Sequence, residues 1–174
     1  MIYLIMGVSC AGKTSVGLEL ASSLGIFFID ADDFHPPANI IKMQNGTPLN
    51  DGDREPWLAD LNKELLNFDT DRKSVVIACS ALKDSYRRLL LKNISDHLIV
   101  YLKANKGLLE KRQINRAGHF FNTSLLASQF EILEPPKEKC IELDSDDSIH
   151  SIVINILEKI QRLHSSLPNN LPSS

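Results

Sequence analysis

The residues best suited to chemistry lie near the N-terminus, in the stretch Gly7 to Thr14 with the sequence GVSCAGKT. It fits the pattern G-x-x-x-x-G-K-[ST], in which glycines allow a tight turn and successive backbone N–H groups surround phosphate oxygens. Lys13 adds a catalytic cation that reaches the outer phosphates, and the Thr14 hydroxyl suits Mg²⁺. The nucleotide-binding residues predicted from this phosphate-binding loop (P-loop) are Gly7, Val8, Ser9, Cys10, Ala11, Gly12, Lys13, Thr14 and Ser15.

The segments on either side of the P-loop have the strand and helix patterns that the motif requires. An apolar run, residues 2–6, precedes it, and a helical pattern of apolar residues follows as far as Gly25. A strand before the loop and a helix after it aim the positive helix N-terminus at the bound anion. The alternative interpretation, an ordinary glycine-containing turn, is disfavoured by this context.

A second group of reactive side chains, Asp30, Asp32, Asp33 and His35, follows the next apolar run, residues 26–29. Ligands of open α/β sheets bind at the carboxyl ends of the strands. Phosphoryl transfer needs one carboxylate to hold Mg²⁺ or its waters and another to orient the attacking hydroxyl. If the chain is extended here, Asp30 and Asp32 project to the same side, with Asp30 at the metal and Asp32 as the catalytic residue at the hydroxyl. Asp33 is the alternative base, and a solvated, helix-capping acidic turn is the competing interpretation.

Short apolar runs alternate with helical patterns along the chain, which predicts an α/β fold with a five-stranded parallel sheet and helices on both faces. The run 75–79 is apolar throughout and is predicted to be the central strand. The predicted strands are residues 2–6, 26–29, 75–79, 98–102 and 140–143. The predicted later helices are residues 38–43, 56–66 (with Pro56 in its first turn), 84–92, 106–115, 124–130 and 149–163.

The composition indicates one globular domain, predicted to span residues 1–164, with a disordered polar tail at 165–174. Of the 174 residues, 43% are hydrophobic and 24% are charged, and the net charge is −3. This charge gives no electrostatic footprint for nucleic acid, and no apolar run is long enough for a membrane span. The three cysteines, Cys10, Cys79 and Cys140, do not form a disulfide framework, which favours a reducing cytoplasm.

Several further blocks of the sequence resemble the gluconokinase family. The most specific are residues 35–39 (HPPAN) and 49–54 (LNDGDR). The similarity continues through residues 78–83, 116–120 and 125–130 and covers most of the chain.

The resemblance implies a P-loop NTPase fold akin to shikimate and nucleoside monophosphate kinases, with a substrate-binding insert at about 34–73 and a short lid at about 116–123. It implies ATP-dependent phosphorylation of D-gluconate at the 6-hydroxyl, with Mg²⁺, in carbohydrate metabolism. It also implies a homodimer as the usual arrangement.

The sequence contains polar residues that suit the acceptor implied by the resemblance. Gluconate is a carboxylate with a chain of hydroxyls, so its pocket needs a cation for the carboxylate and polar groups for the hydroxyls. A solvated surface position is the alternative for each arginine, and a role in the rigid turn before Pro36 is the alternative for His35. The predicted substrate-binding residues are Asp32, His35, Lys42, Arg54, Lys83, Arg87, His119 and Gln129.

Two arginines of the lid region are predicted to act on ATP. Arg112 and Arg116 lie four residues apart and therefore share a helical face. One or both could fold over the phosphates, and Arg116 is the predicted transition-state cation. A basic helix end that complements its dipole is the alternative. Ala117 departs from the family pattern, which commonly has lysine there.

Three other functions compete with this one. A related kinase with another acceptor, such as shikimate or a nucleoside monophosphate, would keep the P-loop and change the pocket. A P-loop switch that reads guanine would need Asn-Lys-x-Asp, whereas Asn105-Lys106 is followed by Gly107-Leu108. A degenerate scaffold is disfavoured because Lys13 and Asp32 are intact.

Overall fold

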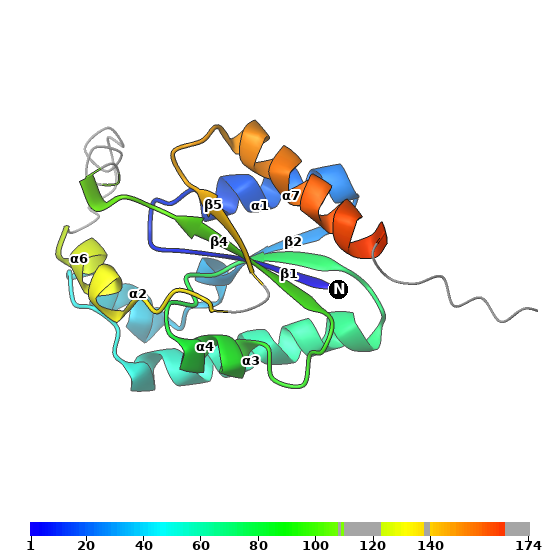
Figure 1. Cartoon of the computed structure of the whole chain (residues 1–174). Coiled ribbons are helices and arrows are strands. Elements are labelled where there is room, and N and C mark those ends of the chain that lie inside the picture. Colours follow the sequence, from blue (N-terminus) through cyan, green and yellow to red (C-terminus); the bar gives the residue numbers. More distant parts are fainter. Residues whose placement is uncertain (108, 110–122, 138–139, 166–174) are drawn as a thin grey trace, which may run out of the picture.

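The computed structural model describes residues 1–107, 109, 123–137 and 140–165. Its centre is a five-stranded sheet with the strand order β2-β3-β1-β4-β5, in which all neighbouring strands are parallel (Figure 1). The strands are β1 (Ile2–Met6), β2 (Phe27–Asp30), β3 (Val75–Ala78), β4 (His97–Lys103) and β5 (Cys140–Asp144). The predicted parallel sheet is confirmed, with strand ends within one residue of those expected.

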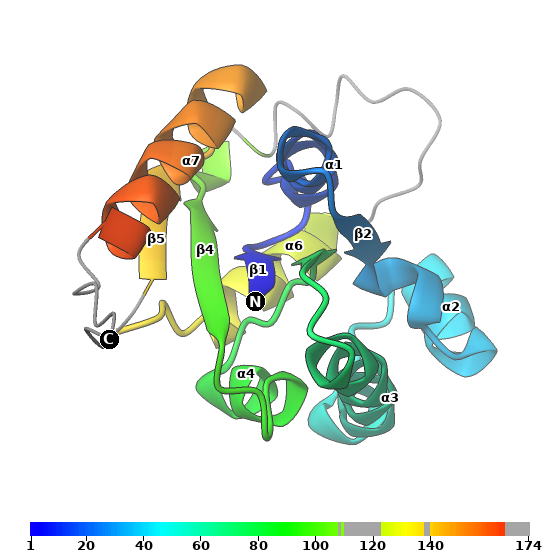
Figure 2. The same ribbon diagram turned by 90° about the vertical axis from the view of Figure 1, so that its right-hand side faces the viewer.

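Helices cover both faces of this sheet (Figure 2). Helices α1 and α7 lie on one face, and α3 and α4 lie on the other. The helical segments are α1 (Lys13–Leu24), the 3₁₀ helix η1 (Ala31–Phe34), α2 (Pro37–Gln44), α3 (Asp51–Thr70), α4 (Asp84–Leu90), α6 (Thr123–Ile132) and α7 (Ile149–Ser165). Within the described ranges, no helix is both long and apolar enough to cross a membrane.

The middle strand of the sheet is β1, which pairs with β3 on one side and β4 on the other. Its side chains alternate between two cores: Ile2, Leu4 and Met6 pack with α3 and α4, whereas Tyr3 and Ile5 pack with α1 and α7. A strand buried on both faces has no polar side to alternate with, which explains its apolar run. The prediction that β3 is central is therefore wrong: it is buried throughout but lies one place from the middle.

Helix α3 begins five residues earlier than the predicted helix 56–66. Its start is a capping box: the Asn50 side chain accepts from the Asp53 N–H at 2.9 Å, and the Asp53 carboxylate accepts from the Asn50 N–H at 3.0 Å. These reciprocal bonds satisfy two amides and define the first turn. Pro56 consequently lies beyond the first turn, so its predicted position is wrong.

Several predicted segments fall outside the described residues. The helix predicted for 106–115 is seen only at 106, 107 and 109. The predicted lid lies outside except for Thr123, and so does the tail from 166 onward. The predicted insert contains α2 and α3, which connect β2 to β3.

Gly17 provides a test of how closely α1 packs on the sheet. A Cβ at this position would lie 2.5 Å from Cε2 of Phe28 in β2. We expect Gly17→Ala to lower the free energy of unfolding by about 1–3 kcal/mol, because the methyl group must displace the ring. Denaturant unfolding measures the change.

Gly52→Ala is the matched control, because Gly52 also lies in a helix but its Cβ would meet only the Asn50 Oδ1 atom, at 3.4 Å. This variant should keep or raise the free energy of unfolding, by up to about 1 kcal/mol, through helix propensity. Equal effects of the two substitutions would contradict the close packing of α1 on Phe28.

Candidate active site

The P-loop leaves the middle of the sheet and leads directly into α1. Its backbone requires glycine at two positions: Gly7 has φ +149°, and a Cβ there would lie 2.7 Å from the carbonyl oxygen of Leu102, while Gly12 has φ +95°. Cys10 also has a positive φ, 64°, although it is not glycine. The loop therefore has the tight turn that its sequence predicts.

Anion-binding groups converge at the end of this loop. Gly12 precedes α1, and no side chain caps the first turn of the helix. The first N–H groups of a helix without such a cap are available to a phosphate and carry a partial positive charge. The Lys13 ammonium folds back over the loop and donates to the Val8 carbonyl at 3.1 Å, which keeps a full positive charge beside these amides.

The predicted metal ligands lie together. The Thr14 hydroxyl donates to Oδ2 of Asp30 at 2.7 Å, which joins the start of α1 to the end of β2. Among the described residues, no group of three or more Asp, Glu, His or Cys side chains could hold a metal ion. Mg²⁺ commonly keeps several waters and takes only one or two protein carboxylates plus phosphate oxygens, so a Thr14–Asp30 pair beside a P-loop fits this ion.

The acidic turn after β2 is not extended, so the expectation that Asp30 and Asp32 project to the same side is wrong. The other carboxylate oxygen of Asp30, Oδ1, accepts from the Asp32 N–H at 3.1 Å and caps η1. This local bond turns the chain immediately after the strand. Asp32 is 77% exposed on its side chain and lines a pocket that Asp33 does not line.

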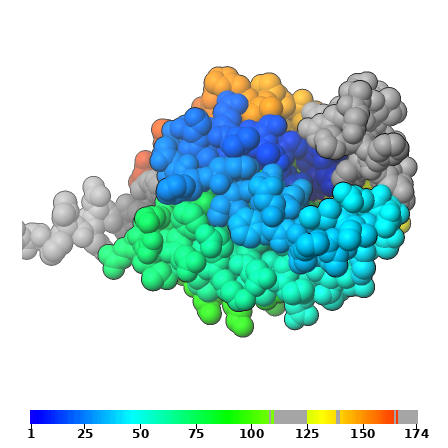
Figure 3. Space-filling view, turned by 180° about the vertical axis from the view of Figure 1, so that it is seen from behind, coloured from blue at the N-terminus to red at the C-terminus, as the bar shows by residue number. Residues whose placement is uncertain are grey.

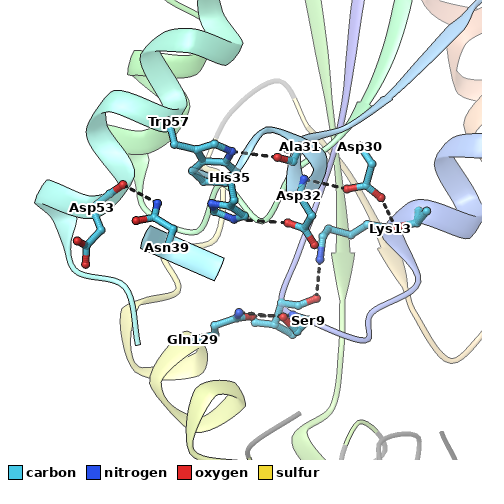
Figure 4. Close-up of polar contacts among 12 residues, drawn as sticks. Ser9, Lys13, Asp30, Ala31, Asp32, His35, Asn39, Asp53, Trp57 and Gln129 are labelled. Atoms are coloured by element: carbon cyan, nitrogen blue, oxygen red, sulfur yellow. Dashed lines mark hydrogen bonds and ion pairs between the residues drawn. The ribbon is translucent and has the colours of Figure 1, made fainter. Parts of the chain in front are cut away.

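This pocket, of about 270 Å³, lies between the P-loop, the acidic turn, α2, α3 and α6. In Figure 3 the dark blue N-terminal residues lie recessed behind the lighter blue and cyan surface. Figure 4 shows Ser9, Lys13, Asp32 and His35 in this region. The lining residues are Ser9, Lys13, Asp32, His35, Ile40, Met43, Gln44, Pro48, Leu49, Arg54, Trp57, Ser80, Leu125, Ser128 and Gln129.

Arg54 is the one predicted carboxylate-binding cation that lines this pocket among the described residues. Its side chain is buried, donates to the Leu49 carbonyl, and lies 5.5 Å from the ring centre of Tyr86. These contacts hold the guanidinium in one place. Because a guanidinium has five N–H donors, it retains capacity for a carboxylate.

The two predicted lysines instead pair with carboxylates at the start of α3. Lys42 contacts Asp53 at 2.6 Å, and Lys83 contacts Asp51 at 2.7 Å. Hydrogen bonds from these lysines lower the pKa of each aspartate below its usual value. Neither lysine lines the pocket.

Arg87 also lies away from this pocket. It is buried, donates to the carbonyls of Ala81 and Leu82 at 3.0 and 3.1 Å, and lines a different cavity with Glu134. Its contacts fix the chain that follows β3, which is a structural role. The structure thus brings Asp32, His35, Arg54 and Gln129 together and leaves Lys42, Lys83 and Arg87 outside the group.

Comparison with known proteins shows which family the chain resembles. The family model for shikimate kinase matches residues 9–124. The thermoresistant gluconokinase of Escherichia coli (strain K12) is 40% identical, over 92% of this chain and 94% of its own length. The gluconokinase of Gluconobacter oxydans is 44% identical, over 76% and 74% of the two chains.

The chain belongs to the gluconokinase family. The crystal structure of a gluconokinase from Sinorhizobium meliloti 1021 has a TM-score of 0.85 to this structure at 40% identity, covering 95% of this chain and 94% of that one. The resemblance inferred from the sequence blocks is therefore confirmed.

The Gln129 side chain, which the sequence predicts to bind a substrate hydroxyl, also makes specific contacts with the P-loop. Its Oε1 accepts from the Ser9 N–H at 2.7 Å, and its Nε2 donates to the Ser9 hydroxyl at 2.8 Å (Figure 4). Helix α6 is thereby joined to the P-loop across 120 residues of sequence. Gln129 also lines the pocket, so one side chain contacts the P-loop and forms part of the pocket wall.

Sequence reasoning missed several pocket residues. Ile40, Met43 and Gln44 lie at i, i+3 and i+4 on α2, and this spacing could have indicated a common face. Ser80 follows β3, where the rule of ligands at strand ends applies. Ser128 on α6 carries no local signal. The predicted residues Arg112, Arg116 and His119 lie outside the described residues.

The chain has three cysteines, of which Cys10 lies in the P-loop. All three are free thiols, as the sequence predicts. Burial raises the pKa of Cys79 to about 12, so this thiol stays protonated at neutral pH. A protonated thiol is a poor nucleophile.

The link between Gln129 and Ser9 can be measured by a double-mutant cycle. Gln129→Met removes both bonds and should lower the free energy of unfolding by about 1–3 kcal/mol. Ser9→Ala removes only the hydroxyl partner, so the cycle should give a coupling energy of about 0.5–1.5 kcal/mol for that bond. Gln161→Met on the exposed side of α7 is the control, with a change within about 0.5 kcal/mol. Additive effects at positions 9 and 129 would contradict the contact.

Proposed function

We propose that the protein transfers the γ-phosphoryl group of ATP to the 6-hydroxyl of D-gluconate, giving 6-phospho-D-gluconate and ADP. One observation carries this proposal: the P-loop lysine Lys13, the exposed carboxylate of Asp32 and the buried Arg54 line the same pocket. Membership of the gluconokinase family supports the choice of acceptor.

The P-loop side of the pocket would bind the nucleotide. Its backbone amides and Lys13 would hold the phosphates, and Thr14 and Asp30 would hold Mg²⁺ directly or through water. The ion would neutralise charge on the phosphates. Arg112 and Arg116 remain predicted contributors to ATP binding, and His119 to substrate binding, from the segment outside the described residues.

The opposite side would bind the acceptor. Arg54 would pair with the gluconate carboxylate, and Asp32 would orient the 6-hydroxyl and accept its proton. The carboxylate and the 6-hydroxyl are at opposite ends of a six-carbon chain, so contacts with these two groups suffice to set its direction. Gln44, Ser128 and Gln129 would bind the hydroxyls between them.

The cellular setting is part of the proposal. The free cysteines and the use of ATP favour the cytoplasm. The homodimer implied by the resemblance stays a prediction.

An assay of ADP release with Mg·ATP tests the acceptor directly. The panel contains gluconate, other sugar acids, shikimate, nucleoside monophosphates and no acceptor. We expect release that depends on gluconate and gives 6-phosphogluconate, because the carboxylate and the 6-hydroxyl at the two ends of its open chain would engage Arg54 and Asp32 together. Activity with shikimate alone would disprove the proposed acceptor and keep the nucleotide site.

Asp32→Asn tests the catalytic role against its neighbour. We expect kcat to fall by about 10²- to 10⁴-fold, because the proton acceptor is lost, while the affinity for an ATP analogue measured by calorimetry is unchanged. Asp33→Asn is the matched control, since Asp33 does not line the pocket. A large loss in the Asp33 variant with an active Asp32 variant would reverse the assignment.

A further inference from the structure

His35 has an unusual environment for a polar side chain beside an open pocket. Its ring stacks on Trp57, with 4.0 Å between ring centres and 20° between planes. Only 6% of its side chain is exposed. The Trp57 Nε1–H donates to the Ala31 carbonyl at 2.9 Å, so the same indole supports the ring and holds the first residue of η1 (Figure 4).

The two ring nitrogens of His35 differ in their surroundings. Nε2 lies 3.8 Å from Oδ1 of Asp32, whereas Nδ1 is buried and has no hydrogen-bond partner among the described residues. Burial lowers the pKa of His35; the charge of Arg54 acts in the same direction, and that of Asp32 opposes it. The imidazole is therefore neutral at pH 7 and carries one N–H. A carboxylate is only an acceptor, which favours this proton on Nε2, facing Asp32.

We propose that His35 is a positioning residue whose Nε2–H orients the Asp32 carboxylate toward the acceptor hydroxyl. The proposal rests on the proposed function and refines the sequence prediction that His35 binds a substrate hydroxyl. Asp32 is mostly exposed, and an exposed carboxylate has several rotamers within reach. A donor fixed by stacking selects one of them. The present 3.8 Å separation needs only a small rotation to become a hydrogen bond, and such bonds commonly tighten when substrates bind.

Direct binding of a substrate hydroxyl by His35 fits the contacts less well. Nδ1 is enclosed by protein, and Nε2 already faces a carboxylate. Stacking on Trp57 prevents the ring from turning toward the pocket centre. A buried Nδ1 without a hydrogen-bond partner lowers the stability of the folded protein. The ring orientation that buries Nδ1 also places Nε2 near Asp32, which gives a reason for this orientation.

Three substitutions distinguish the contribution of each ring nitrogen from that of ring stacking. His35→Gln places an amide N–H near the Nε2 position, His35→Asn places one near Nδ1, and His35→Phe keeps the stacked ring without either nitrogen. We expect the Asn and Phe variants to lose about ten- to a hundredfold in kcat with little change in KM for gluconate, because a misplaced Asp32 affects the transition state more than binding. The Gln variant should recover most of this loss.

His150→Asn is the control, because His150 is exposed on α7, contacts Glu19 and does not line the pocket. Thermal unfolding of every variant identifies any that is simply misfolded. Equal activity of the Phe variant and the unsubstituted protein would overturn the proposal, since stacking alone would then suffice. A raised KM with unchanged kcat would overturn it in favour of direct substrate binding.

Ring ¹⁵N NMR of the unsubstituted protein provides a readout that needs no acceptor. We expect the neutral imidazole with its proton on Nε2, and a proton on Nδ1 would overturn the proposal. If the unsubstituted protein phosphorylates no gluconate, the proposed function fails by that result alone. The NMR measurement then still decides whether the proton is on Nε2, the nitrogen that lies near Asp32.

Discussion

The close approach of Gly7 to the carbonyl oxygen of Leu102 determines where the phosphate loop leaves the sheet. A Cβ at Gly7 would lie 2.7 Å from that oxygen, so the loop turns directly against the neighbouring strand β4. Because all five strands are parallel, the segments that follow β1, β2 and β3 emerge at the same edge. This edge therefore collects Lys13, Asp32 and Ser80 around one pocket, although they are far apart in sequence.

The charges around this pocket are divided between folding and binding. Asn50 and Asp53 cap α3, Asp53 also pairs with Lys42 of α2, and the Asn39 amide donates to the Asp53 carbonyl at 2.9 Å. Residues of the HPPAN and LNDGDR blocks thus join α2 to α3 by hydrogen bonds and also line the pocket. Arg54, which follows this cap directly, is the cation of this segment that lines the pocket.

The sequence predicts the parts of this protein that depend on local patterns. The sheet, the P-loop and the Thr14–Asp30 pair follow from apolar periodicity, a short motif and the rule that ligands bind at strand ends. The partners of Lys42 and Lys83 depend on contacts between helices, which no local pattern encodes. The same is true of Gln129, whose resemblance block indicated the site but whose partner Ser9 lies 120 residues away.

The 3₁₀ turn after β2 allows two nearby carboxylates to take the different roles proposed for them. A 3₁₀ helix has three residues per turn, so side chains three apart lie above one another, whereas those two apart point in different directions. Asp32 and His35 are three apart and lie close together, while Asp30 faces Thr14. An extended chain would instead have placed Asp30 and Asp32 on one side, where both would compete for the same ion. The capping bond from the Asp32 N–H to Asp30 therefore separates the proposed metal-binding side of the turn from the proposed acceptor-binding side.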